Sequence, residues 1–141
     1  GISTDIITGF CSETEEDHQQ TISLMKEIKY DYAYMFSYSE RPKTLAERKY
    51  KDDVAEAVKK RRLAEIIELQ RLNSGIKTLL GIGQVHEVLV EGFSKKSNEM
   101  LMGRNSQNTV VVFPKQNYKK GDYVNILATR CTTSTLIGEP V

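Results

Sequence analysis

The chain has 141 residues with 20 basic and 19 acidic side chains, enough to bury one core or two small ones. The balanced charge excludes a uniformly basic nucleic-acid binder, and no apolar run approaches the roughly 20 residues of a membrane span. Cys11 and Cys131 lie far apart without metal-ligand spacing, which indicates a reduced, cytoplasmic protein. Because the chain opens on Gly1 without an initiator methionine, we expect a piece of a longer protein.

The first part of the sequence predicts a strand, a helix and a second strand. Ile2–Phe10 has the pattern of a buried strand, and Thr14 with Asp17 has the spacing of a capping box at a helix start. The aromatic-rich segment Tyr32–Ser39 predicts the second strand. This order is typical of a parallel βαβ unit. One such unit does not complete a sheet, so its apolar faces need further parts of the protein or a second copy, and we expect self-association.

A long helix with a basic run follows. Val54–Leu72 carries a broad apolar stripe, and Asn73–Gly75 predicts its end. The run Lys59–Arg62 has two interpretations, a solvated face or a contact with phosphates.

After Lys77 the pattern changes to short strands separated by turn residues, which predicts a small OB-like five-stranded barrel. The strands are expected near Gln84–Glu91, Glu99–Arg104, Thr109–Phe113, Asp122–Thr129 and Thr135–Gly138. Barrels of this size often bind single-stranded nucleic acid through a basic face. The expected basic rim consists of Lys95, Lys96, Arg104, Lys119 and Lys120. The amides between Arg104 and Val110 suit either a plain turn or a polar ligand, and Asn105 and Asn108 are the candidate contacts.

Long segments resemble the radical S-adenosylmethionine methylthiotransferases. The first two are I-S-T-D-I-I-T-G-F-C-S-E-T-E-E-D-H (2–18) and Y-M-F-S-Y-S-E-R-P-K-T-L-A (34–46). Two more resemble the RNA-binding TRAM barrel of that family, V-L-V-E-G-F-S-K-K-S (88–97) and G-R-N-S-Q-N-T-V-V-V-F (103–113). The resemblance implies an α+β fragment, with part of a TIM-like radical barrel at residues 1–75 and a TRAM barrel at 76–141.

Within the family the motifs most resemble the branch that methylthiolates C2 of N6-isopentenyladenosine beside the tRNA anticodon. The resemblance implies S-adenosylmethionine and two [4Fe-4S] clusters in the full-length protein, with the anticodon stem-loop as partner. The family's cluster cysteines have no counterpart here, so we expect a fragment that binds no cluster or metal and is inactive alone. Alternatives are a free-standing RNA-binding module, or a methylthiotransferase acting on a ribosomal protein or on threonylcarbamoyl-adenosine tRNA.

The resemblance also indicates cofactor-binding residues, namely Ser3, Asp5, Gly9, Arg41 and Thr44. Polar residues on a parallel strand suit either a cofactor cavity or internal hydrogen bonds. The chain departs from the family at G-F-C-S-E-T, where the usual form is G-F-P-G-E-T, and at Lys43, which stands in place of a common glycine. If that position needs a positive φ, lysine is disfavoured there. His18 and His86 are expected to be structural or solvated.

Overall fold

The computed structural model describes residues 1–95 and 97–141, which form two compact units. One, which we name the sheet unit, is Ser3–Asn73, and the other, the barrel unit, is Ser74–Val141 with Gly1–Ile2. Lys96, predicted for the basic rim, lies outside the described residues. Among the described helices, none is long and apolar enough to cross a bilayer.

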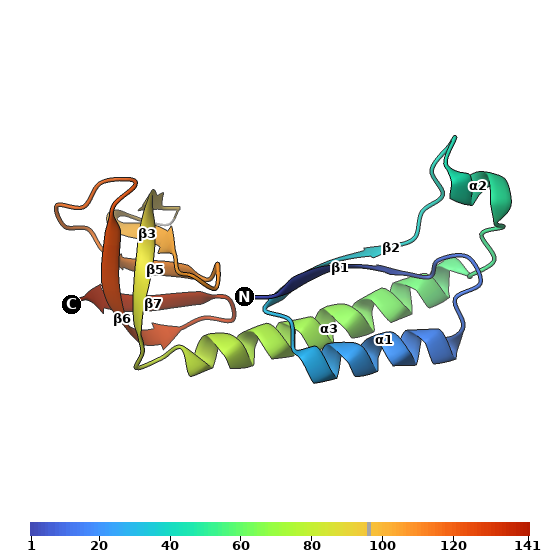
Figure 1. Cartoon of the computed structure of the whole chain (residues 1–141), viewed down its shortest axis with the longest axis horizontal. Helices are drawn as coiled ribbons and strands as arrows, with labels where there is room; N and C mark the ends of the chain where they lie inside the picture. Colours follow the sequence, from blue (N-terminus) through green and yellow to red (C-terminus); the bar gives the residue numbers. More distant parts are fainter. Residues whose placement is uncertain (96) are drawn as a thin grey trace. The chain divides into compact units, whose positions relative to one another are not determined.

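A parallel βαβ unit forms the start of the sheet unit. It consists of β1 (Ser3–Thr8), α1 (Glu15–Ile28) and β2 (Tyr32–Ser37). The two strands pair in parallel from the first residue of each to the last. Figure 1 shows α1 and the first part of α3 (Glu56–Leu80) on the same side of this two-stranded sheet. The predicted crossover is therefore confirmed.

The start of α1 is fixed by the predicted capping box. Thr14 Oγ1 accepts a hydrogen bond from the Asp17 backbone N–H at 3.1 Å, and the Asp17 carboxylate accepts one from the Thr14 N–H at 2.9 Å. Two of the N–H groups that a helix start leaves unpaired are satisfied in this way. The helix ends at Lys29, which adopts a left-handed conformation with φ of 54°. Local sequence chemistry alone determines the start of this helix.

The opposite face of β1 and β2 is open, so the prediction of a buried first strand was wrong for that face. Ile7, Tyr34 and Phe36 are each more than half exposed. Helices cover one side of the pair only, whereas parallel sheets are normally covered on both sides. The sequence has the apolar residues of a covered face, and the sheet unit by itself supplies no cover for it.

Two of the four residues of the basic run on α3 are buried, which neither interpretation of the sequence anticipated. Lys59 and Arg62 are 3% and 4% exposed. Lys59 Nζ lies 2.6 Å from the Asp52 carboxylate, and Arg62 Nη1 lies 2.8 Å from the Glu13 carboxylate. Positions 59 and 62 share one helix face, and that face points into the unit. Buried charges require such partners, because desolvation is costly without them.

Arg61 links the exposed edge of the same network. It lies 2.6 Å from the Glu15 carboxylate and 2.7 Å from that of Glu65. Hydrogen bonds from Arg61 and Gln19 lower the pKa of Glu15 to about 2. Arg61 and Arg62 of the basic run are thus partners of Glu13 and Glu15 beside the start of α1. Lys60, at 72% side-chain exposure, is the member of the run that fits a solvated face.

The helix continues past Asn73–Gly75, so the predicted stop was wrong. A glycine in a helix costs only about 1 kcal/mol, which one local and one long-range hydrogen bond of Thr78 offset here. Thr78 Oγ1 donates to the Ser74 carbonyl at 2.8 Å and to the Thr133 carbonyl at 3.1 Å. The helix stops instead before Gly83, which has a φ of 79° and donates its N–H to the Ala128 carbonyl. Left-handed backbone at a glycine is the usual helix terminator.

The barrel unit contains the five predicted strands in a closed barrel of order β3-β4-β5-β7-β6. All neighbours pair antiparallel except β5 and β7, which run parallel, and β3 pairs with β6 to close the barrel. The strands are β3 (Val85–Ser94), β4 (Ser97–Arg104), β5 (Val110–Pro114), β6 (Tyr123–Cys131) and β7 (Thr135–Pro140).

The inward side chains of all five strands form one core. It consists of Val88, Val90, Leu101, Val111, Phe113, Val124, Ile126, Ala128 and Leu136. Full burial of a large apolar side chain contributes about 1.5–3 kcal/mol, so this core is the main source of barrel stability. Closure also removes the unpaired strand edges that an open sheet would expose.

Replacing Gly103 by alanine should destabilise the barrel unit by about 2–3 kcal/mol. A Cβ at Gly103 would overlap the Leu89 carbonyl oxygen and approach Val88 Cγ1 to 2.7 Å. Backbone atoms of a neighbouring strand yield less readily than a flexible side chain. The free energy of unfolding from denaturant titration measures the effect.

Gly75→Ala is the matched control, because the nearest atom outside its own helix backbone is Thr133 Cγ2 at 3.9 Å. That change should stabilise the chain by about 0.5–1 kcal/mol. An unchanged unfolding midpoint for Gly103→Ala would contradict the close approach of β3 and β4.

Candidate functional site

A cleft of about 430 Å³ lies on the outer face of β4, β5 and β7. Side chains alternate along each strand, so the residues between the core positions point outward. In the strand register Met102 lies beside Val112 and Val112 beside Ile137. The cleft is lined by Ser94, Lys95, Ser97, Met100, Met102, Arg104, Val110, Val112, Arg130, Thr132, Thr135 and Ile137.

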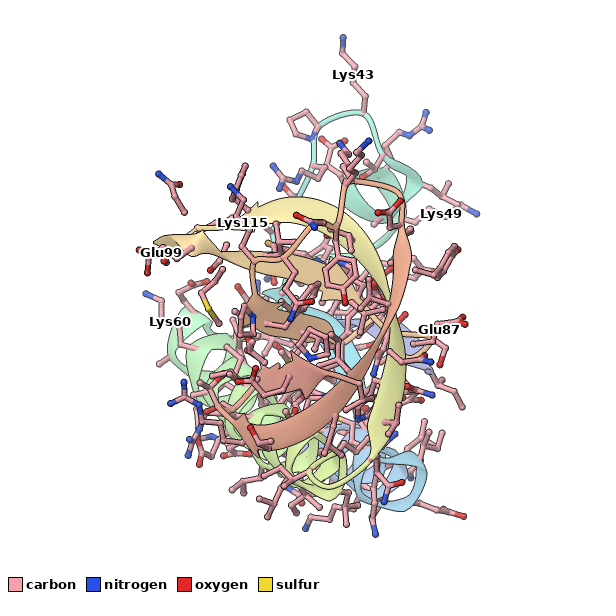
Figure 2. All side chains as sticks on the ribbon, turned by 90° about the vertical axis from the view of Figure 1, so that its left-hand side faces the viewer. Lys43, Lys49, Lys60, Glu87, Glu99 and Lys115 are labelled. Carbon is pink, nitrogen blue, oxygen red and sulfur yellow. The ribbon has the colours of Figure 1, made fainter. Side chains whose placement is uncertain are left out.

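The charge of the cleft is of one sign. The described residues of its lining include Lys95, Arg104 and Arg130 and no carboxylate. The carboxylate of Glu91 lies 3.4 Å from Arg104 Nε, and both side chains are 40% exposed, so solvent weakens this pair. Figure 2 shows Glu87 projecting from β3 on the opposite side of the barrel from Glu99 and Lys115. The cleft therefore offers cations around a floor of apolar side chains.

Two residues of the predicted basic rim, Lys95 and Arg104, line this cleft, whereas Lys119 and Lys120 do not. Both of these lysines are exposed in the turn before β6, where the Lys119 N–H donates to the Asp122 carboxylate at 2.8 Å. Gly121 closes that turn with a φ of 99°. The described residues of the predicted basic rim therefore do not form one surface: two line the cleft, and two lie in a turn outside it.

Arg130 was missed by sequence reasoning. Strict alternation from Ala128 would point Arg130 into the barrel with Val124 and Ile126. The register between β6 and β7 shifts between Ala128 and Arg130, and Arg130 is exposed in the cleft. An irregularity of this kind inserts a residue and reverses the side-chain direction beyond it. No residue type in this stretch signals the shift.

Asn105, predicted as a ligand contact, is instead the centre of its own loop. It is 8% exposed, and its Oδ1 accepts hydrogen bonds from the N–H groups of Gln107 and Thr109 at 3.1 and 2.9 Å. Its Nδ2 donates to His86 Nδ1 at 3.1 Å. His86 Nε2 donates to the Gly81 carbonyl at 2.9 Å, which leaves Nδ1 as the acceptor. The two side chains hold the loop in place, and His86 is structural.

Asn108 shapes the same loop and orients Arg104. It adopts a left-handed conformation with φ of 63°, and its carbonyl accepts a hydrogen bond from Arg104 Nη1 at 2.9 Å. Asparagine tolerates this conformation better than most residues. The guanidinium is thereby held at the edge of the cleft, with the Asn108 side chain exposed beside it.

The residues predicted to bind a cofactor fall into two groups in the sheet unit. Ser3 and Asp5 are exposed on the open face of β1, in register with Tyr32 and Tyr34 of β2. Gly9 follows the strand with a φ of 72°, and its N–H donates to the Glu13 carboxylate at 2.5 Å. A Cβ there would overlap the side chain of buried Lys59, so a close approach already requires this glycine.

Arg41 and Thr44 lie in one turn before α2 (Leu45–Lys49). Thr44 caps that helix, accepts the Glu47 N–H at 3.2 Å and donates to the Arg41 carbonyl at 2.8 Å. Both side chains are within reach of solvent. Lys43 between them has a φ of 68°, so the position where the family commonly has glycine is left-handed.

His18 belongs to an ion-pair network rather than standing isolated. Fully buried, it lies 2.7 Å from the Glu65 carboxylate, and Glu15 completes a group whose ligand atoms lie within 4.8 Å of one another. Arg61 is hydrogen-bonded to both carboxylates. A cation would have to displace this arginine, so the group serves as a structural network.

The two cysteines do not fit a cluster site. Cys11 is buried in the sheet unit and Cys131 is half-buried in the barrel unit. A [4Fe-4S] cluster takes several thiolates brought together, and the chain supplies two cysteines in all. The ligands of any cluster would have to come from outside these 141 residues.

Comparison with known proteins identifies relatives for the whole chain. Residues 81–141 match the TRAM domain. The tRNA-2-methylthio-N(6)-dimethylallyladenosine synthase of Amoebophilus asiaticus is 65% identical over 99% of this chain, and that of Christiangramia forsetii is 58% identical over 100%. The synthase of Phocaeicola vulgatus is 53% identical over 100%. The chain spans only 29–31% of the length of these relatives. The resemblance to methylthiotransferases is therefore confirmed.

Replacing Lys43 by glycine should stabilise the sheet unit by up to about 1 kcal/mol. Left-handed backbone costs a residue with a Cβ about 1–2 kcal/mol, part of which is offset by the greater freedom of glycine in the unfolded chain. The backbone N–H of residue 43 keeps its bond to Glu47 at 3.0 Å. Denaturant titration measures the free energy of unfolding of this variant and of the control Lys51→Gly. Residue 51 is exposed and is not among the residues with positive φ, so glycine there should destabilise the sheet unit. Equal effects of the two changes would contradict strain at Lys43.

Replacing Asn105 by alanine should destabilise the barrel unit by about 2 kcal/mol, because it leaves the Gln107 and Thr109 N–H groups without their acceptor. Hydrogen exchange at these two amides should accelerate together. Gln107→Ala removes an exposed side chain and keeps the N–H, so it should change stability by less than about 0.5 kcal/mol. Slow exchange retained in Asn105→Ala would show that the loop does not depend on this side chain.

Proposed function

Because nearly the whole chain is similar to the tRNA-2-methylthio-N(6)-dimethylallyladenosine synthases, we propose that it is the C-terminal part of such an enzyme. The reaction would place a methylthio group on C2 of N6-isopentenyladenosine beside the tRNA anticodon. The observation that carries this proposal is 65% identity over 99% of the chain. The names of these relatives favour isopentenylated tRNA over a ribosomal protein or threonylcarbamoyl-adenosine tRNA as substrate.

The two parts of the chain would have different tasks. Residues 1–75 would complete a TIM-like radical S-adenosylmethionine barrel, which the parallel βαβ unit and its open face support. Ser3 and Asp5 would contact S-adenosylmethionine from that face. Arg41 and Thr44 would lie near the mouth of the completed barrel. Gly9 would shape the adjoining turn. When bound, S-adenosylmethionine and two [4Fe-4S] clusters would supply radical and sulfur chemistry, with cluster ligands from elsewhere in the enzyme.

The TRAM barrel, residues 76–141, would hold the anticodon stem-loop. The cleft supports this, because it gathers Lys95, Arg104 and Arg130 without a carboxylate in its lining. Lys119, Lys120 and the Asn108 side chain are exposed and would extend the RNA contact, while Asn105 would position the loop. Because its substrate would be tRNA in the cytoplasm, the enzyme would be cytoplasmic. The open face of β1 and β2 is where the isolated chain would self-associate.

A chimaera tests the proposal. The matching segment of the Flavobacterium johnsoniae synthase, which is 56% identical over 99% of this chain, is replaced by these 141 residues. The chimaera is expressed in a strain without its own synthase, and tRNA nucleosides are analysed by mass spectrometry. We expect the methylthiolated nucleoside to reappear. The same host enzyme with the segment deleted is the control and should give none.

A soluble chimaera that loads its clusters yet forms no methylthiolated nucleoside would contradict the proposal. The host enzyme expressed in parallel shows that the strain supplies isopentenylated tRNA.

A further inference from the structure

The floor of the cleft has an unusual composition for the outside of a small barrel. Met100, Met102, Val110, Val112 and Ile137 all occupy outward positions on β4, β5 and β7. Outward positions on such strands are normally polar, with the apolar residues in the core. Here both sides of these three strands are apolar. A second apolar face that is ringed by cations is a feature of binding surfaces.

The lining restricts the chemistry of the occupant. The three cations favour an anion, since Glu91 pairs with Arg104 only as a half-exposed partner outside the lining, and the apolar floor favours a flat or apolar group joined to that anion. A nucleotide has both parts, since every base has an apolar face and every linkage carries a phosphate. The cleft volume of about 430 Å³ lies within the range of about 300–1,000 Å³ that is typical of ligand pockets.

The base must be unpaired to reach the floor. In an A-form duplex the base faces are stacked inside the helix, so only a loop or single strand can present one. Ser97, Thr132 and Thr135 also line the cleft, and their hydroxyls can bond a base edge or the ribose 2′-hydroxyl. Arg104 is already oriented by the Asn108 carbonyl, which lowers the entropic cost of holding a phosphate.

We propose that this cleft holds an unpaired nucleotide of RNA, with its base on Met102, Val112 and Ile137 and its phosphates at Arg104 and Arg130. This inference rests on the proposed function, since it specifies which part of a tRNA the barrel contacts. An RNA loop fits better than an acidic peptide, because carboxylate side chains would use the cations and leave the apolar floor uncovered.

The test measures fluorescence anisotropy of labelled RNA with the full 141-residue chain. Three probes of equal length are compared: a single-stranded RNA octamer, the same octamer paired in a duplex, and an octamer of ribose phosphates without bases. We expect the octamer to bind about tenfold more tightly than the base-free oligomer, because a base face buried on the apolar floor contributes about 25 cal/mol per Å² of apolar surface removed from water. The duplex should also bind more weakly than the single strand.

Variants separate the floor from the cations. Met102→Gln with Val112→Thr should weaken octamer binding about tenfold and leave the salt dependence unchanged. Arg104→Gln and Arg130→Gln should each weaken binding and reduce the slope of log K against log salt by about 0.7. Val85→Thr on β3, which is 57% exposed and outside the cleft, is the control for the floor change. Lys60→Gln is the control for charge, and both controls should bind within about twofold of the unchanged chain.

Three outcomes would overturn the proposal: equal affinity for base-free and normal octamers, octamer binding unaffected by the floor variant, or equal competition by an acidic peptide. The base-free probe uses the unchanged protein, so the first result does not depend on whether a variant folds. Failure of the chimaera together with floor-dependent octamer binding would reject the enzyme assignment and retain the cleft. A working chimaera together with octamer binding that the floor variant does not change would retain the enzyme assignment and reject the cleft proposal.

Discussion

Closure of the barrel is the constraint on which the candidate site depends. The ring is completed by the β3–β6 pair and by the parallel pair β5–β7, and each strand then has one inner and one outer set of side chains. At Gly103 and Gly138 a Cβ would overlap carbonyl oxygens of the adjacent strands, those of Leu89 and Leu127. The close strand contact thus requires glycine at two points. With the strands fixed this way, Met102, Val112 and Ile137 come into register on the outside.

The sequence predicted most of the elements because local chemistry determines them. The capping box at Thr14, the βαβ order and the five barrel strands all follow from short-range patterns, and the structure bears them out. The errors come from long-range effects. The helix passes Gly75 because Thr78 finds a partner in the distant Thr133 carbonyl, and Arg130 faces the cleft because of a register shift. Neither partner nor shift is visible in a window of neighbouring residues.

The basic residues of the sequence have different surroundings in the two units. The run Lys59–Arg62 suited either a solvated face or a contact with phosphates, but Lys59 and Arg62 are buried against Asp52 and Glu13. These carboxylates neutralise the buried basic side chains within the sheet unit. The barrel is less charged, yet three of its cations, Lys95, Arg104 and Arg130, share a cleft whose described lining has no carboxylate. The proposed ligand site therefore rests on the local separation of charge in the structure and not on the density of charge in the sequence.

The two units also differ in what they need from outside. The barrel closes on itself, buries a core drawn from all five strands and, among the residues that the structure describes, leaves no strand edge unpaired in its ring, so its outer face needs no further strand. The sheet unit leaves Ile7, Tyr34 and Phe36 exposed on a parallel pair, an arrangement that normally has cover on both faces. An open face with Ser3 and Asp5 among its apolar residues is suited to line an interior only when further strands enclose it. The barrel can therefore present its cleft alone, whereas the polar residues of β1 gain a defined environment only within a larger sheet.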